Sequence, residues 1–234
     1  MIRRPRTTAP VVADRDVAGG SAGASVVFTG VTCRYGRRRV VDAVDLAVEP
    51  GEHVALTGAN GSGKTTLLRT VLGLHPIVEG TVAVGGDVCD TGRSGWTRRR
   101  RQVAWVPQRL TPGRFPLLVR ELLASVGDRT AVGAAAGAAT TLGVAELDDR
   151  PLHTLSGGQL QRVFLARALG AVAAGAQVLL ADEPTAALDF DGQERVASLL
   201  ATLAVTVVVV SHDRAMARAC DRVAEMAAGK LRVI

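Results

Sequence analysis

Residues 53–76, HVALTGANGSGKTTLLRTVLGLHP, predict a short buried strand, a glycine-rich loop and a helix in direct succession. The loop matches the phosphate-binding P-loop pattern, and it stands between a strand and a helix as that pattern requires. Glycines let backbone N–H groups turn inward around phosphates, and the helix N-terminus adds partial positive charge. Lys64 reaches the β and γ oxygens, and the Thr65 hydroxyl is a candidate Mg²⁺ ligand. A glycine-rich turn that merely contains a lysine is the alternative, but one of only two lysines in the chain stands at the required position.

The sequence therefore predicts a nucleotide site built on one continuous segment. Its candidate nucleotide-binding residues are Gly58, Ala59, Asn60, Gly61, Ser62, Gly63, Lys64, Thr65 and Thr66.

Two further apolar runs end in polar residues. Residues 177–181 lead into Asp182 and Glu183, and residues 205–210 lead into Ser211 and His212. Continuous rather than alternating apolar runs indicate strands covered on both faces, hence a parallel α/β sheet with ligands at the carboxyl ends of its strands. Asp182 can hold Mg²⁺ through water, and Glu183 can orient or deprotonate an attacking water, so the pair favours hydrolysis of the nucleotide over mere binding. Two solvated acids in a turn are the alternative.

Composition limits the class of protein. The 234 residues are 47% hydrophobic, 21% charged and 3% aromatic, which is typical of one large or two small folded domains. No apolar run approaches the roughly 20 residues that span a bilayer. The N-terminus lacks the apolar stretch of a signal peptide. An odd cysteine count without CxxC spacing favours reduced thiols. The net charge of +6 allows a phosphate ligand, a membrane face or nucleic acid and does not choose among them.

Along the chain we expect a disordered tail over residues 1–25 and one nucleotide-binding domain over residues 26–234. Short β-rich runs broken by turns predict an antiparallel β-subdomain before the P-loop. Residues 96–171 are rich in helix formers and predict a helical insertion, with helices at 119–126 and 159–169 and a weaker one within the glycine-containing segment 131–143. The expected fold is α/β: a P-loop core with a mostly parallel sheet, the β-subdomain and this helical insertion.

LSGGQLQR, residues 155–162, together with the P-loop, resembles the signature of ABC (ATP-binding cassette) ATPases. Tyr35, Gln108 in WVPQR, Ala187-Leu188-Asp189 and His212 follow in the order of that family, so the resemblance covers residues from about 26 to 230. One departure is Ala186, where the family often has serine. It removes one possible hydroxyl contact.

The resemblance implies particular roles. Tyr35 would stack on adenine, Gln108 would contact Mg²⁺ and the attacking water, and His212 would contact the γ-phosphate and steady Glu183. Without the family resemblance, each residue has a plainer interpretation. Tyr35 would be a packing residue, Gln108 an exposed loop residue and His212 a core histidine. Residues around a predicted helix start would form a second anion site. This second site comprises Ser156, Gly157, Gly158 and Gln159, and the resemblance adds Asp189 to the candidate nucleotide-binding residues.

In the family, the phosphate of this second site comes from another subunit, so the resemblance implies a head-to-tail homodimer with two ATP molecules. A single cassette without a spanning segment implies a separate integral membrane permease and a place on the cytoplasmic face of the membrane. The segments after Gln108 and around the signature look most similar to importers of zinc and manganese, which work with a substrate-binding protein.

An efflux-pump ATPase and a soluble regulatory ATPase remain alternatives. The arginines at 98–101 are either a solvated face or a contact with the membrane subunit or anionic headgroups. Nucleic acid is not expected as a partner, because no reading helix or stacking platform is evident.

Overall fold

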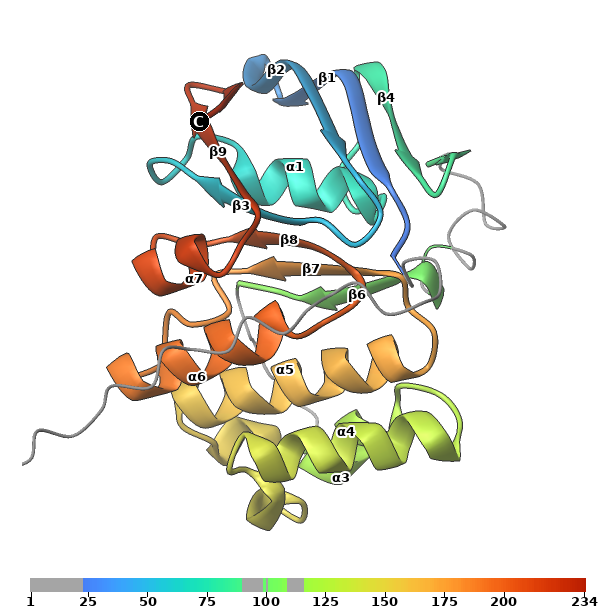
Figure 1. The fold of residues 1–234 in the computed structure, drawn as a ribbon, viewed down its shortest axis with the longest axis vertical. Helices are drawn as coiled ribbons and strands as arrows, with labels where there is room; N and C mark the ends of the chain where they lie inside the picture. The colour runs from blue at the N-terminus through green and yellow to red at the C-terminus, as the bar shows by residue number, and fades with distance from the viewer. Residues whose placement is uncertain (1–22, 90–98, 100, 109–115) are drawn as a thin grey trace, which may run out of the picture.

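The computed structural model describes residues 23–89, 99, 101–108 and 116–234. Two sheets and a helical layer make up this part of the chain (Figure 1). The first sheet is antiparallel and has the strand order β2-β1-β4-β5. Its strands are β1 (Val26–Tyr35), β2 (Arg38–Val48), β4 (Glu79–Val84) and β5 (Asp87–Val88). Strands β1 and β2 are the β-subdomain expected before the P-loop, whereas β4 and β5 join the same sheet from the segment that follows α1.

The second sheet has the strand order β10-β9-β3-β8-β7-β6, and all its pairs are parallel except β9 with β10. Its strands are β3 (His53–Thr57), β6 (Val103–Val106), β7 (Val178–Asp182), β8 (Thr206–Val210), β9 (Arg222–Ala227) and β10 (Lys230–Val233). Every residue of β7 and β8 is buried, which explains their continuous apolar sequences. The mostly parallel sheet of the expected fold is confirmed.

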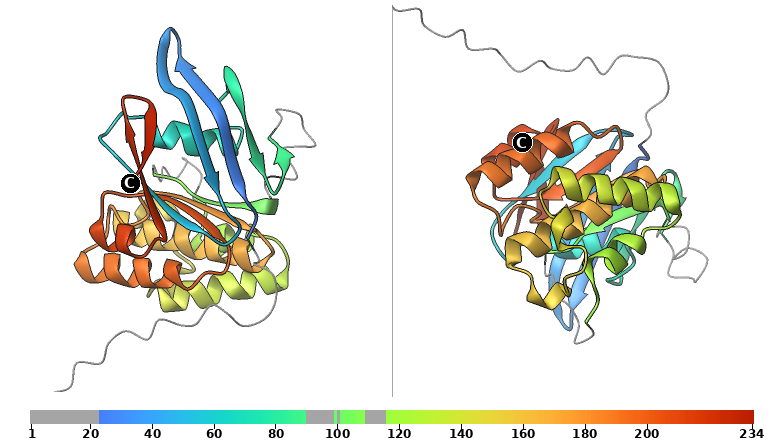
Figure 2. Two further views of the ribbon diagram at one scale, coloured as in Figure 1. Left: turned by 45° about the horizontal axis from the view of Figure 1, so that its top comes forward. Right: turned by 90° about the horizontal axis from the view of Figure 1, so that it is seen from below.

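Helices cover both faces of this parallel sheet. The helices are α1 (Lys64–Val71), α3 (Val119–Ala124), α4 (Arg129–Thr141), α5 (Gly157–Ala173), α6 (Phe190–Ala201) and α7 (Arg214–Arg218), with short 3₁₀ turns at Ala145–Leu147 and Leu152–Thr154. Figure 1 shows α1 between the two sheets, α5 and α6 on the opposite face, and α3 and α4 beyond α5; Figure 2 shows the same layers from two other sides.

The core is divided by the parallel sheet into two apolar clusters. Leu180 faces the cluster around α1 and the antiparallel sheet, whereas its neighbours Leu179 and Ala181 face the cluster around α3–α6. The same alternation occurs in β3, where Leu56 and Ala55 face opposite clusters. A strand buried on both faces fixes its register strongly, and this holds the polar residues after β7 and β8 in place.

Two boundaries differ from the sequence-based expectation. Residues 23–25, expected to end the tail, are packed on the fold: Ala24 is buried, and its carbonyl accepts a hydrogen bond of 2.7 Å from the Thr206 hydroxyl. The expected tail at residues 1–22 lies outside the described residues. Strand β6 falls inside the range 96–171 expected to be a helical insertion, but it pairs with β7 in the core sheet. The helices that follow begin at Val119.

Helix α4 forms despite Gly133 and Gly137 because it has a packing surface. Its buried residues Ala131, Ala135 and Ala139 recur at i and i+4 and lie on one face. Opposite them is Gly170 of α5, where an added Cβ would come within 2.6 Å of the Ala135 Cβ. Small side chains therefore let the two helices approach closely. Among the described residues, no helix has the length and apolar character needed to cross a bilayer.

Candidate nucleotide site

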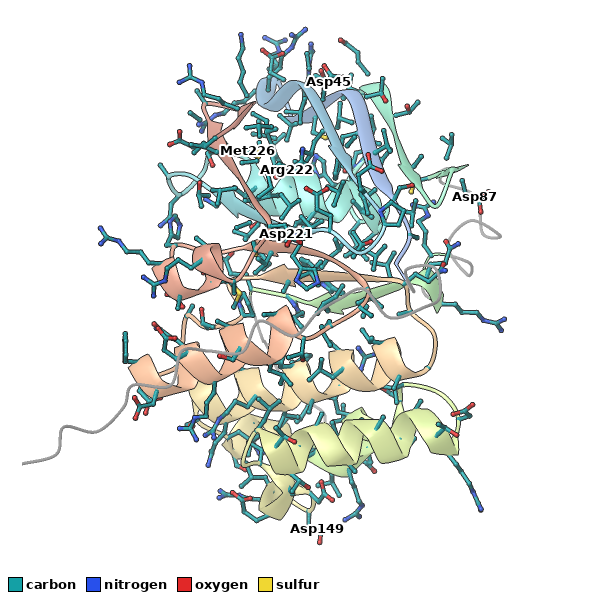
Figure 3. All side chains as sticks on the ribbon, viewed as in Figure 1. Asp45, Asp87, Asp149, Asp221, Arg222 and Met226 are labelled. Carbon is teal, nitrogen blue, oxygen red and sulfur yellow. The ribbon has the colours of Figure 1, made fainter. Side chains whose placement is uncertain are left out.

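The P-loop follows β3 and leads into α1, and two of its glycines are required by close contacts. Gly58 has φ +128°, and an added Cβ would lie 2.0 Å from the Met226 carbonyl oxygen. Gly63 has φ +110°, and an added Cβ would lie 2.3 Å from the Val40 carbonyl oxygen. Met226, labelled in Figure 3, belongs to β9, the strand beside β3. The loop is thus pressed against the core with no room for side chains at these positions.

A pocket of about 440 Å³ lies over this loop. It is lined by Tyr35, Arg38, Val40, the residues 60–66, Gln108, Asp182, Glu183 and Val210. The sequence-predicted residues from four separate elements therefore meet at the carboxyl ends of β3, β6 and β7, as expected for an open α/β sheet. Of the predicted loop residues, Gly58 and Ala59 do not line the pocket; their carbonyl oxygens face Lys64 instead.

Lys64 is the cation that the P-loop itself contributes to this pocket. Its Nζ donates hydrogen bonds to the carbonyl oxygens of Gly58 at 2.6 Å and Ala59 at 3.0 Å. Burial lowers the pKa of Lys64, and the carboxylates of Glu183 and Asp182 oppose this effect. An incoming phosphate can replace the two neutral carbonyls with charged oxygens, which form stronger hydrogen bonds to an ammonium group.

Asp182 ends β7 and is fully buried. Burial raises the pKa of its carboxyl, while the Thr65 hydroxyl, Arg69 and Lys64 act in the opposite direction. Within the described part of the chain, neither carboxylate oxygen of Asp182 completes a hydrogen bond of ordinary geometry. A buried carboxylate without such partners is unfavourable unless a cation or water approaches it. The residues present therefore fit a hard cation such as Mg²⁺ between Asp182 and Thr65.

Glu183 is the first residue after β7, and its backbone has φ +53°, in the left-handed region. Its Oε1 lies 3.3 Å from Nε2 of His212, which follows β8. Burial raises the pKa of the Glu183 carboxyl; His212 is the first of the groups that lower it. A pocket of about 490 Å³, next to the first, is lined by residues that include Asn60, Gln108, Glu183 and His212. This arrangement can hold and polarise a water beside bound phosphate.

Tyr35 lies at the rim of the pocket with 51% of its surface exposed. Its ring contacts the His75 ring, with centroids 4.6 Å apart and an interplanar angle of 49°. One face of the tyrosine is thus supported while the other remains accessible. His75, Arg38 and Val40 were not predicted from the sequence as site residues. The run of arginines beside Tyr35 was a signal for Arg38, whereas the position of His75 depends on the tertiary fold.

The signature residues line a different pocket. Ser156 is the N-cap of α5: its hydroxyl accepts from the Gln159 backbone N–H at 3.2 Å, and the Gln159 side chain accepts from the Ser156 N–H at 3.0 Å. Ser156, Gly158 and Asp189 line a pocket of about 410 Å³ that shares no lining residue with the P-loop pocket. Asp189 also caps α6 by accepting from the Gly192 N–H at 2.9 Å. Within one chain, the two sets of predicted residues are not brought together.

The fold and the P-loop pocket define a nucleoside-triphosphate-binding protein of the P-loop class. The model of the family described as ABC transporter matches residues 41–186, so the chain belongs to this family, as its motifs indicated. It is an ATPase that binds ATP.

Known relatives agree with this assignment. The zinc import ATP-binding protein ZnuC of Cereibacter sphaeroides is 39% identical over 81% of this chain and 74% of its own length. The phosphonates import ATP-binding protein PhnC of Caulobacter vibrioides is also 39% identical, over 84% of this chain and 82% of its own. A dimeric structure of MJ0796, a bacterial ABC transporter cassette, superimposes with a TM-score of 0.80 at 29% identity, covering 88% of this chain and 96% of that one.

Proposed function

We propose that this ATPase is the subunit that drives an importer whose membrane pore is a separate permease, with a divalent metal such as zinc or manganese as cargo. The observation that carries the catalytic part is Glu183, whose carboxylate lies in the pocket beside His212 at 3.3 Å and next to the P-loop residues. Glu183 accepts a proton from the attacking water. His212 fixes the position of the Glu183 carboxylate and contacts the γ-phosphate. Lys64 binds the β- and γ-phosphates, and Tyr35 stacks on adenine.

Mg²⁺ belongs to this proposal as the partner of ATP. Thr65 and Asp182 would hold it, with Gln108 at the edge of the pocket. The two buried carboxylate oxygens of Asp182, which complete no ordinary hydrogen bond among the described residues, support the assignment. When bound, Mg²⁺ neutralises charge that develops on the phosphate oxygens.

The active form is a head-to-tail homodimer. Support comes from the separation of the two pockets, because the P-loop pocket of one chain is not lined by Ser156, Gly157, Gly158, Gln159 or Asp189. A second copy would bring its signature helix to the first copy's ATP. The dimeric structure of the similar MJ0796 cassette supports this arrangement.

The permease is proposed to dock in a groove between the parallel sheet and the helical layer. This groove of about 450 Å³ is lined by Leu72, Leu74, Arg99, Val103, Ala104, Trp105, Ser125, Val126, Arg167 and Ala171. Of the arginines at 98–101, Arg99 is only 4% exposed and so is not part of a solvated face, whereas Arg101 is exposed. Residues 98 and 100 lie outside the described residues. The Arg167 Nε donates to the Ser125 hydroxyl at 2.9 Å. Apolar walls with two arginines suit an apolar segment that carries a carboxylate.

The proposal of a metal cargo rests on sequence similarity to known importers. ZnuC and PhnC have the same 39% identity to this chain, although one is named for zinc and the other for phosphonates. Overall identity therefore does not separate these cargoes. The metal proposal depends on the segments after Gln108 and around the signature. The permease, the place at the cytoplasmic membrane face and an indirect substrate-binding protein follow from the importer proposal.

The decisive experiment is capture of membrane partners by the Glu183→Gln variant with ATP and Mg²⁺, followed by mass spectrometry. We expect a multi-span permease in the Glu183→Gln sample and its loss with the matched Lys64→Ala variant, which cannot hold ATP. Uptake by the reconstituted complex with zinc, manganese or a phosphonate then identifies the cargo. Outward transport would support an efflux pump instead, and recovery of soluble partners alone would support a regulatory ATPase.

A further inference from the structure

We propose that Gln161, a residue of the signature helix α5, is a positioning residue for the general base Glu183 of the same chain. Its role is to hold the backbone of Glu183 and so to link the helix of the second anion site to the carboxylate that activates water. This inference rests on the proposed role of Glu183 in hydrolysis.

The contact itself is direct. The Gln161 side-chain Nε2 donates a hydrogen bond of 3.0 Å to the Glu183 backbone carbonyl oxygen. Gln161 is 4% exposed and is among the few buried polar residues of the described chain. A carbonyl oxygen only accepts, so the amide nitrogen must face it. A buried amide is retained at such a position only where it has a partner.

The backbone of Glu183 needs this support. Its φ of +53° lies in the left-handed region, which is unfavourable for a residue with a side chain. The surroundings hold it from two sides. The Glu183 N–H donates to the Val210 carbonyl of β8 at 2.8 Å, and the Glu183 carbonyl accepts from Gln161 and, at 3.3 Å, from the Ala186 N–H. These backbone contacts therefore set the direction in which the Glu183 side chain extends from the backbone.

The face of α5 that carries Gln161 is pressed on the same loop. Gly158 lies three residues earlier, hence on the same side of the helix, and an added Cβ there would be 2.8 Å from the Ala187 carbonyl oxygen. At Gly157 an added Cβ would be 3.6 Å from the Ala187 Cβ. The loop from Glu183 to Leu188 and the first turns of α5 therefore move together.

This arrangement gives Gln161 a function beyond packing. Ser156 and Gly157, at the N-terminus of α5, would meet the ATP held by the partner subunit, whereas Gln161, in the second turn, contacts the base that serves the chain's own ATP. If the partner's nucleotide displaces α5, the hydrogen bond from Gln161 to the Glu183 carbonyl would transmit this displacement to the backbone of Glu183. We expect the loss of this bond to reduce turnover rather than nucleotide binding.

The first test is steady-state ATP hydrolysis by Gln161→Met, which keeps the length of the side chain but cannot donate. We expect kcat to fall about 10- to 100-fold, because a displacement of about 1 Å at a reacting group has effects of this size, and KM for ATP to stay within about twofold. The control is Thr202→Val, which removes a hydroxyl that donates to the Leu199 carbonyl at 2.8 Å at the end of α6. Thr202 lines none of the pockets described above, so kcat should stay within about twofold.

The second test repeats the substitution in a Glu183→Gln background. If Gln161 acts through Glu183, Gln161→Met causes no further loss of the residual rate, because the two changes are not additive. A further loss of 10-fold or more, an equal rise in KM, or an unchanged kcat in Gln161→Met would each overturn the proposal. If Gln161→Met does not fold, Gln161→Asn serves instead, since its donor is one methylene too short. Retained hydrolysis in Glu183→Gln alone would overturn the assignment of the base, which is a separate failure.

Discussion

At the scale of single residues, the carboxyl group of Glu183 is subject to opposing influences. Burial raises its pKa above the ordinary 4.5, while His212, 3.3 Å away, lowers it. A general base must be ionised to accept a proton, so turnover declines as the pH falls through the pKa of the folded protein. The balance between burial and His212 therefore sets the acid side of the pH profile.

This balance predicts the effect of His212→Ala on pH dependence. Without the imidazole, burial acts with less opposition, the pKa of Glu183 rises, and the acid limb of the kcat–pH profile moves to higher pH. The height of the profile also falls, because His212 is proposed to meet the γ-phosphate. Steady-state rates across a pH series measure both effects. A lower profile with an unshifted acid limb would show that His212 does not influence the charge of the base.

A second prediction concerns Lys64, whose Nζ is held by the carbonyls of Gly58 and Ala59. Lys64→Ala should abolish measurable ATP binding, because the ammonium group that belongs to the P-loop itself is removed while the loop backbone remains. Fluorescence titration with a labelled ATP analogue measures this affinity. An affinity within about threefold of the native protein would contradict the phosphate assignment. Arg38, which lines the same pocket near Tyr35, offers a comparison: its replacement by Ala should weaken binding far less.

At the scale of elements, packing of α4 on α5 outweighs two unfavourable glycines. Gly137 is exposed, an added Cβ there meets nothing within 4 Å, and its φ lies outside the left-handed region. Gly137→Ala should therefore stabilise the protein by about 0.5–1 kcal/mol, which raises the melting temperature by about 1–4 °C for a chain of this size. Thermal unfolding measured by circular dichroism gives the shift.

Gly58→Ala is the opposite case and serves as the control. The added Cβ would lie 2.0 Å from the Met226 carbonyl oxygen at a φ of +128°, so the loop or β9 must move. We expect a melting temperature below that of the native protein. A Gly137→Ala variant that melts no higher than the native protein would indicate that α4 is less regular than its backbone suggests.

The elements also show what the sequence could predict. The P-loop, β7 and β8 have strong local signals, since a continuous apolar run before polar residues is sufficient to place a buried strand end. Strand β6 was missed because only four residues, Val103–Val106, stand next to an arginine-rich stretch with no period of their own. The bond from Gln161 to Glu183 could not be predicted, because it joins residues 22 positions apart through the packing of α5 on a loop.

At the scale of the whole molecule, the proposed partners use different surfaces. The P-loop pocket and the signature pocket would be completed by a second copy of the chain, while the groove with Leu74 and Arg167 lies between α1, β6, α3 and α5. This groove joins the parallel sheet to the helical layer. A membrane subunit seated there would contact both parts and would respond to their relative movement, which is how closure around ATP could be coupled to transport.

This separation of surfaces predicts that permease binding can be removed without loss of ATP hydrolysis. Leu74 is 55% exposed at the edge of the groove, and Leu74→Asp would place a carboxylate on its apolar wall. We expect capture of the permease to fall at least about 10-fold, which corresponds to about 1.4 kcal/mol, while kcat and KM of the isolated ATPase stay unchanged. Val233→Asp is the matched control, because Val233 is 49% exposed on β10, outside the groove. Equal losses of capture in both variants would indicate a general surface effect, and undiminished capture by Leu74→Asp would mean that the permease docks elsewhere.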